Sequence, residues 1–166
     1  MFMPKGVHGN MPHFAKISDS NVVEKVEVFS QEDIDANGGD YSSGAESWVN
    51  SYRGGTWKQC SYNANQRNIY PSIGDSWDSA NNKFKAKKPA ASCTFNSTSY
   101  QWEYPVARPS NEYFMEGETK ICKMIPYDWD DDNQKWIKTN GAIKVSDGTI
   151  DTRNFEWNGS AWVVSS

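Results

Sequence analysis

Four pairs of aromatic residues, each pair separated by seven positions, constrain the fold of this chain more than any other feature of its sequence. Mostly polar, turn-forming residues fill the positions inside each pair. Aromatic rings on facing positions of two antiparallel strands contribute roughly 0.2–1 kcal/mol over an alanine pair. The repeat therefore predicts a series of short β-hairpins, each held together by two facing rings. The pairs are Trp77 and Phe84, Phe95 and Trp102, Trp129 and Trp136, and Phe155 and Trp162.

The last pair gives the most specific expectation, because Asn-Gly is the strongest sequence signal for a two-residue hairpin turn. With Asn158 and Gly159 as that turn, Phe155 lies directly opposite Trp162. The other three pairs have the same separation, so we expect the same facing arrangement there. Isolated two-stranded hairpins are marginally stable in water. These hairpins are therefore expected to pack on one another, on the N-terminal part of the chain or on another chain.

The apolar composition also favours sheets. The 166 residues include no leucine, but nine isoleucines, ten valines and 23 aromatic residues. Leucine is the usual apolar helix former, whereas β-branched and aromatic residues suit a half-buried sheet surface. We therefore predict a mostly β fold, a β-rich α+β protein with one short helix. The net charge of −4 argues against a broad basic surface for nucleic acid.

The N-terminal part of the chain has a mixed pattern. A polar turn separates its first two β-prone runs, and an acidic, glycine-containing segment follows them. Serines that could act as N-caps and a Gly-Gly stop then bracket a run with one apolar helical face. The predicted elements are a hairpin of residues 14–17 and 22–29, a loop at 30–43, a helix at 45–53 and a strand at 56–62.

These patterns divide the chain into four segments. Residues 1–10 are expected to be an extended arm, because Pro4, Gly6 and Gly9 interrupt them. No run approaches the roughly 18 apolar residues that cross a bilayer, and no export signal is present, so we expect no membrane partner and folding in a reducing cytoplasm. The expected segments are the arm at 1–10, a small α+β unit at 11–75, aromatic hairpins at 76–109 and a C-terminal hairpin unit at 110–166.

Few residues suggest chemistry. Cys60, Cys93 and Cys122 are widely spaced, with no pattern typical of a zinc site or a disulfide framework. The aspartates between Asp128 and Asp132 begin like a calcium loop, but Asn133 and Thr139 stand where that motif requires glycine and glutamate. A solvated hairpin loop is the simpler interpretation.

The sequence shows no recognisable catalytic arrangement. Only His8 and His13 could provide an imidazole, and neither lies in a nucleophile or phosphate-binding motif. A carboxylate pair for glycoside hydrolysis remains open, because 21 acidic residues allow many spatial pairings. We therefore expect no enzymatic activity, no cofactor and no metal.

Aromatic residues outside the four pairs are the candidates for contact with another molecule. They could complete the packing of the hairpins, form a protein interface, or stack on sugar rings. The sequence leaves these alternatives open. The candidate residues are Trp48, Trp57, Tyr100, Tyr104, Tyr113 and Tyr127.

The chain between residues 11 and 109 resembles small proteins encoded by marine bacteriophages, including phages of cyanobacteria. The C-terminal aromatic hairpins also look like units of phage tail and fibre proteins. The segments that carry the resemblance are Met11-Pro12-His13-Phe14-Ala15-Lys16-Ile17, Asn21-Val22-Val23, Gly54-Gly55-Thr56-Trp57-Lys58-Gln59, Ser61-Tyr62-Asn63, residues 74–84 and residues 95–109.

This resemblance implies a non-enzymatic structural protein of the virion, assembled in the host cytoplasm. Its expected place is the particle surface, as a tail, neck or baseplate fibre component or as a capsid decoration. The expected partners are other virion structural proteins and further copies of the same chain. The competing hypothesis is a carbohydrate-binding module that contacts host surface polysaccharide. That hypothesis requires two or three coplanar, solvent-facing rings on one surface, whereas a scaffold requires the paired rings to be buried or covered by another chain.

Overall fold

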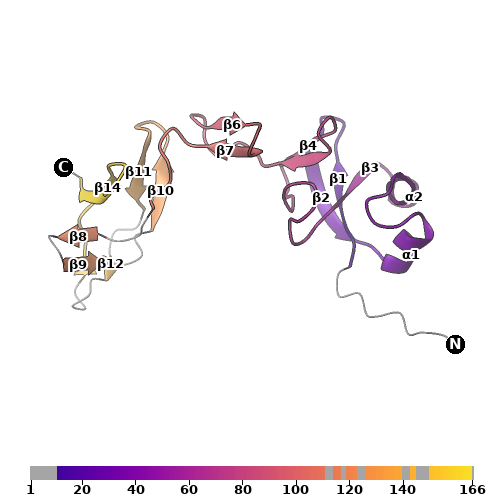
Figure 1. The fold of residues 1–166 in the computed structure, drawn as a ribbon, viewed down its shortest axis with the longest axis horizontal. Helices are drawn as coiled ribbons and strands as arrows, with labels where there is room; N and C mark the ends of the chain where they lie inside the picture. The colour runs from indigo at the N-terminus through magenta and orange to yellow at the C-terminus, as the bar shows by residue number, and fades with distance from the viewer. Residues whose placement is uncertain are drawn as a thin grey trace. The chain divides into compact units, whose positions relative to one another are not determined.

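The computed structural model of the chain describes residues 11–110, 114–116, 119–122, 126–139, 143–144 and 150–165. These residues form a β-rich fold with two helices and several small antiparallel sheets, which confirms the predicted fold class (Figure 1). They belong to two compact units that divide between Lys87 and Lys88. Residues 1–10, predicted to be an extended arm, lie outside the described part of the chain.

A three-stranded antiparallel sheet organises the first unit. It consists of β1 (His13–Ile17), β2 (Val23–Val28) and β3 (Thr56–Cys60), in the order β2-β1-β3. The predicted opening hairpin and the strand after the helix are thus confirmed. Successive side chains of a strand point to opposite faces of a sheet, and both Phe14 and Ala15 of the central strand are fully buried. Both faces of this sheet are therefore covered.

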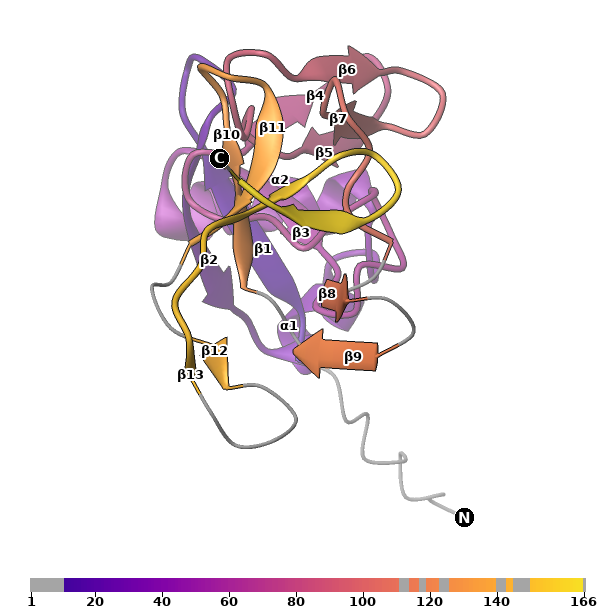
Figure 2. The same ribbon diagram turned by 90° about the vertical axis from the view of Figure 1, so that its left-hand side faces the viewer.

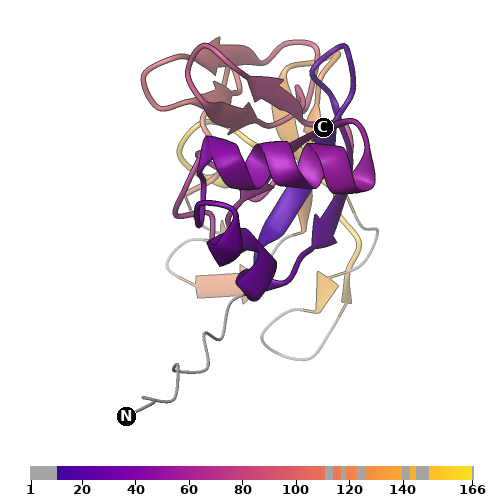
Figure 3. The ribbon, with the colours of Figure 1, turned by 90° about the vertical axis from the view of Figure 1, so that its right-hand side faces the viewer.

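Different elements cover the two faces. On one face, Phe14 and Trp57 form a core with apolar side chains of α1 (Gln31–Ala36) and α2 (Ser43–Arg53), which Figure 3 shows in front of the sheet. On the other face, the first aromatic pair packs against apolar residues of β1 and β3. The first unit is consequently a layered structure with the sheet in its middle.

Helix α2 confirms the predicted helix. The Ser42 hydroxyl oxygen caps its first turn by accepting a hydrogen bond from the Ala45 N–H at 3.0 Å. At the other end, the Gly54 N–H donates to the Asn50 carbonyl oxygen at 2.9 Å, and Gly54 has a φ of +76°. Glycine takes a positive φ without the steric cost that a Cβ atom brings, so the chain turns out of the helix there.

Helix α1 lies inside the segment that was predicted to be a loop, so that prediction was wrong for residues 31–36. Ile34 is its one buried residue, and a single apolar side chain produces no helical periodicity in the sequence. The acidic residues Glu32 and Asp33 occupy the first turn, where they interact favourably with the helix dipole. Packing of Ile34 into the core then holds this short helix in place.

Three of the four predicted aromatic pairs lie on facing positions of antiparallel strands. The ring centroids in these pairs are 4.8, 5.3 and 5.0 Å apart, in chain order. The predicted register is therefore confirmed for Trp77 and Phe84, Phe95 and Trp102, and Trp129 and Trp136. The strands are β4 (Ser76–Asp78), β5 (Lys83–Lys85), β6 (Thr94–Asn96), β7 (Gln101–Glu103), β10 (Tyr127–Asp130) and β11 (Lys135–Lys138).

The loops of these three hairpins are closed in the same way. In each hairpin, the last residue before the loop is an Asp or Asn. Its side-chain oxygen accepts a hydrogen bond from a backbone N–H group of the loop. Asp78 and Asp130 make a matching second bond, each accepting at 2.8 Å from the amide nitrogen of an asparagine three positions later. The fourth loop residue has a positive φ in all three hairpins. These residues are Asn82, Tyr100 and Gln134.

The fourth hairpin corrects the predicted register. In β14 (Phe155–Trp157) and β15 (Trp162–Val164), Trp157 faces Trp162 and Phe155 faces Val164, so Phe155 does not lie opposite Trp162. The loop has four residues instead of two. The Asn158 side-chain oxygen accepts the N–H groups of Ser160 and Ala161, which closes this longer loop. This register forms two apolar cross-strand pairs, whereas the two-residue turn forms one.

The second unit is built around a four-stranded sheet of order β10-β11-β14-β15, in which Figure 2 shows β10 and β11 side by side. Its core consists of the buried rings of Phe114, Trp136, Phe155, Trp157 and Trp162. Aromatic side chains are therefore the main constituents of this core. The remaining described strands are β8 (Phe114–Glu116), β9 (Thr119–Cys122), β12 (Ile143–Lys144) and β13 (Ile150–Asp151).

Candidate functional site

The aromatic residues singled out in the sequence pack largely within their own units. Trp57 is 1% exposed and lies in the core of the first unit. Trp48 is half-buried against that core, and its ring stacks on Tyr52 with the planes 6° apart. Because each of these two rings covers one face of the other, neither ring has both of its faces open to a ligand.

The candidates in the second unit mostly support the hairpins. Tyr100 is buried and contacts the Phe95 ring edge-on. Tyr104 and Tyr127 are half-buried, and both rings contact Trp136. The remaining candidate, Tyr113, lies outside the described residues. Within each unit, the described candidates therefore mainly pack against neighbouring aromatic side chains or the core.

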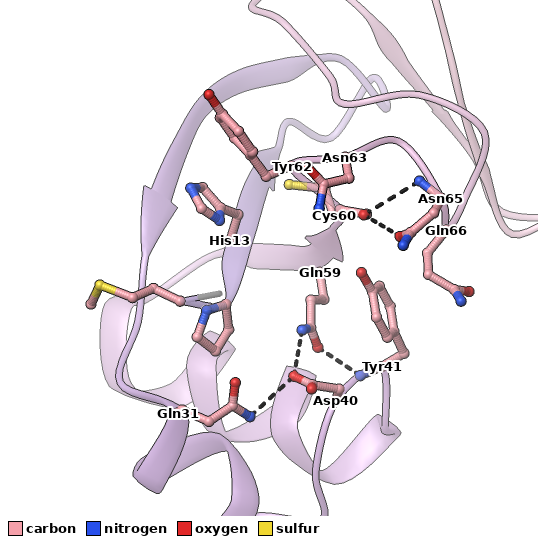
Figure 4. Close-up of a pocket in the computed structure, with 13 residues that line it drawn as sticks. His13, Gln31, Asp40, Tyr41, Gln59, Cys60, Tyr62, Asn63, Asn65 and Gln66 are labelled. Carbon is pink, nitrogen blue, oxygen red and sulfur yellow. Dashed lines mark hydrogen bonds between the residues drawn. The ribbon is translucent and has the colours of Figure 1, made fainter. Parts of the chain in front are cut away.

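The first unit instead contains a pocket of about 250 Å³ that the sequence did not reveal. It lies beside the ends of β1 and β3 and receives residues from the loop after α1 and from the loop after β3 (Figure 4). In that view His13 and Tyr62 lie at the upper left, while Asp40 and Tyr41 lie at the lower right. The lining is mainly polar and rich in carboxamide side chains, which come from Gln31, Gln59, Asn63, Asn65 and Gln66.

Gln59 organises the inner wall of the pocket. Its side chain is almost fully buried, and its amide nitrogen donates to the Asp40 carboxylate at 2.8 Å. Its side-chain oxygen accepts the Tyr41 N–H at 2.6 Å. Gln31 adds a longer hydrogen bond of 3.4 Å to the same carboxylate oxygen of Asp40. Four residues from three separate parts of the chain are thereby held in one network.

Tyr41 has an unusual backbone conformation for its residue type. Its φ of +59° lies in the left-handed region, which costs a non-glycine residue of order 1 kcal/mol or more. The hydrogen bond from its N–H to Gln59 offsets this cost. Burial raises the pKa of the Tyr41 hydroxyl, although a hydrogen bond with Ser61 acts in the opposite direction. The ring is consequently fixed at the pocket wall.

The loop after β3 is fixed by a buried ion pair. Arg67 donates to the Glu46 carboxylate at 2.5 Å and to the Gln59 carbonyl oxygen at 2.9 Å. The two charged side chains are only 8% and 9% exposed. Glu46 also accepts hydrogen bonds from Lys58 and from the Gln59 N–H. The charges are therefore paired, and they connect α2, β3 and the loop.

An aromatic group forms the outer edge of the pocket. Tyr62 and His13 stack with ring centroids 5.6 Å apart and planes 28° apart. Tyr70 meets both rings edge-on, at 5.4 and 5.6 Å. Tyr62 remains 67% exposed, and the adjacent Met11 is 60% exposed. The rim thus combines a supported ring with a large solvent-facing surface.

Cys60 also lines the pocket, but its thiol is buried. Burial raises the pKa of this thiol from 9.0 to about 12, against a smaller lowering effect from Arg67. The reactive thiolate is therefore suppressed near neutral pH, which fits a packing role. Cys93 in the second unit is likewise a buried free thiol.

We expect the stability of the first unit to fall as pH rises from about 9 toward 12, because the unfolded chain releases the Cys60 proton before the folded chain does. Each pH unit in this window lowers the free energy of unfolding by at most about 1.4 kcal/mol. Urea unfolding at a series of pH values measures this slope. Cys60→Ala should have a shallower slope at the start of the window, and equal slopes in the two proteins would contradict the assignment.

The acidic loop that resembles the start of a calcium motif has structural partners. Asp131 accepts hydrogen bonds from the backbone of Ala91 and Ser92 and from the indole of Trp129. The side-chain hydrogen bond from Ser92 is the main reason that the pKa of Asp131 is lowered. Among the described residues, no group of three histidines, cysteines or acidic residues is placed to hold a metal ion. In the same part of the chain, no helix is long and apolar enough to cross a membrane.

Comparisons with protein-family models, with curated proteins and with solved structures found no match for this chain. The pocket residues themselves had one visible signal in the sequence. Carboxamide residues are concentrated at Asn63, Asn65, Gln66 and Asn68. They follow Tyr62, an aromatic residue outside the four seven-residue pairs. The contributions of Gln31, Asp40 and Gln59 had no such signal, because the fold brings them together from distant positions.

Proposed function

We propose that this chain is a non-enzymatic structural protein of a bacteriophage particle. It acts as an accessory on the particle surface, as a component of the tail, neck or baseplate fibre or as a capsid decoration. The resemblance of residues 11–109 to small marine phage proteins supports this proposal. The structural observation that supports it is the series of short aromatic hairpins, each closed by its own loop.

The buried rings favour a scaffold over a ligand-binding role for the hairpins themselves. Of the eight rings in the four pairs, Phe95, Trp102 and Trp129 are half-buried, and the other five are at most 6% exposed. Side chains buried this deeply stabilise the fold and offer no surface to a ligand. Such hairpins can present loops and strand edges to neighbouring subunits, so further copies of this chain and other virion proteins are the proposed partners.

The test is to purify particles of the phage that encodes the chain and to search them for it by mass spectrometry. We expect its peptides at a fixed ratio to the major capsid protein, and we expect an antibody against the chain to label one region of the particle in electron micrographs. Absence from purified particles, with abundant protein in the infected cell, would overturn the proposal.

A further inference from the structure

The pocket of the first unit joins a stacking surface to several hydrogen-bonding groups. We propose that it binds a neutral sugar residue of a glycan, with the Tyr62 ring stacking on the sugar and the carboxamides and Asp40 holding its hydroxyl groups. This site lies among residues that were not candidates on sequence grounds. It does not depend on the particle assignment, because the scaffold role rests on the hairpins and the sugar site rests on the pocket.

The rim supplies a surface suited to a sugar ring. A pyranose has faces lined by C–H groups and an edge of hydroxyls, so it is recognised by an aromatic face together with polar groups nearby. His13 covers one side of the Tyr62 ring at 5.6 Å, while Tyr62 is still 67% exposed. Tyr70 supports both rings from the side. Tyr62 is thus rigidly held with much of its surface open to a ligand.

The pocket wall supplies the hydrogen-bonding groups. Asn63 and Gln66 line the pocket, and their side chains make none of the hydrogen bonds found among the described residues. Each carboxamide can donate and accept at once, as a sugar hydroxyl also does. Asp40 presents a carboxylate of which one oxygen is bound by Gln31 and Gln59. These groups match vicinal hydroxyls better than an apolar ligand, which would leave them unpaired.

The charge of the pocket selects a neutral sugar. Asp40 is the acidic residue in its lining, and no lysine or arginine occurs among the described residues that line it. The nearby Arg67 is already paired with Glu46 and with the Gln59 carbonyl oxygen. An anionic sugar would therefore meet a carboxylate without a free cation to compensate. The volume of about 250 Å³ suits a terminal sugar residue rather than a long bound chain.

The site is also preorganised, because hydrogen bonds within the chain already hold several of its residues in place. Gln59 fixes Asp40 and the strained Tyr41, and the Ser61 hydroxyl pairs with the Asn65 side chain at 2.5 Å. Arg67 anchors the far end of the same loop in the core. Groups that are already ordered lose little conformational entropy on binding, which raises affinity.

Saturation-transfer difference NMR on the full chain tests the proposal. The probes are neutral oligosaccharides ending in glucose, galactose, mannose or N-acetylglucosamine, and anionic ones ending in sialic or uronic acid. We expect ring-proton signals from at least one neutral probe and none from the anionic probes. Silence from every neutral probe, or a preference for an anionic probe, overturns the proposal.

Two tyrosines with equal exposure provide the matched control. Tyr62→Ala should weaken binding of the responding probe about tenfold or more, because it removes the stacking ring. Tyr52→Ala removes a 68% exposed tyrosine from helix α2 of the same unit and should leave binding unchanged. Asn63→Ala should also weaken binding. Equal affinities in all three variants would overturn the proposed site, and chemical-shift dispersion checks that each variant is folded.

Discussion

Replacing Glu46 with glutamine is expected to lower the free energy of unfolding of the first unit by about 3–5 kcal/mol. The change leaves the 8% exposed Arg67 guanidinium without its charged partner, and Lys58 loses the same carboxylate. A buried charge without a partner costs far more than the net gain from the intact pair. Hydrogen exchange of the β1 and β3 amides, followed by mass spectrometry, measures the loss within this unit.

Glu27 provides a matched control for that experiment. It also bridges two cations, Lys25 and Arg53, but its side chain is 26% exposed and its partners are 46% and 43% exposed. Exposed pairs contribute about 0–1 kcal/mol, because water already solvates the separated charges. Glu27→Gln should therefore change exchange little. Similar losses for the two variants would show that burial of the Glu46 cluster is not the source of its effect.

Replacing Trp136 with alanine is expected to destabilise the second unit by about 3–5 kcal/mol. The side chain is 2% exposed, and its ring contacts Tyr104 at 4.6 Å, Trp129 at 5.0 Å and Tyr127 at 5.5 Å between centroids. Removing it leaves a cavity at the centre of the aromatic core. Exchange of the β10 and β11 amides measures the effect, while the β1 amides report on whether the first unit is unchanged.

Trp136→Phe separates the two contributions of this side chain. It retains most of the buried ring but loses the indole N–H, which donates to the Val106 carbonyl oxygen at 3.1 Å. Such a hydrogen bond contributes about 0.5–1.5 kcal/mol. The phenylalanine variant should thus lose much less stability than the alanine variant. An equal loss in both would place the hydrogen bond, and not the packed ring, at the origin of the stability.

The hairpins were predictable because the residues that determine each one are close together in the sequence. In Trp77 and Phe84, or Trp129 and Trp136, the facing rings and the loop between them lie within eight consecutive residues. The register of the fourth hairpin differed from the prediction because the Asn-Gly rule considers only the two turn residues. There the Asn158 side chain caps a longer loop, and Trp157 gains an aromatic partner.

Helix α1 and the pocket could not be predicted for a related reason. Ile34 is a single apolar residue whose burial depends on a sheet formed by other parts of the chain. Likewise, Gln31, Asp40 and Gln59 are separated by many residues and meet only after the sheet and helices have packed. A sequence pattern shows which residues share a local face, but it does not show which distant loops converge.

The repeated loop closure also has a consequence for how such chains form and change. Two eight-residue segments have facing rings at their ends, matching capping bonds and a positive φ at the fourth loop residue. They are Trp77-Asp78-Ser79-Ala80-Asn81-Asn82-Lys83-Phe84 and Trp129-Asp130-Asp131-Asp132-Asn133-Gln134-Lys135-Trp136. Contacts with so little sequence separation form on the microsecond timescale, before distant strands meet. An eight-residue unit that specifies its own turn can be duplicated or moved along a gene without disturbing the register of its neighbours.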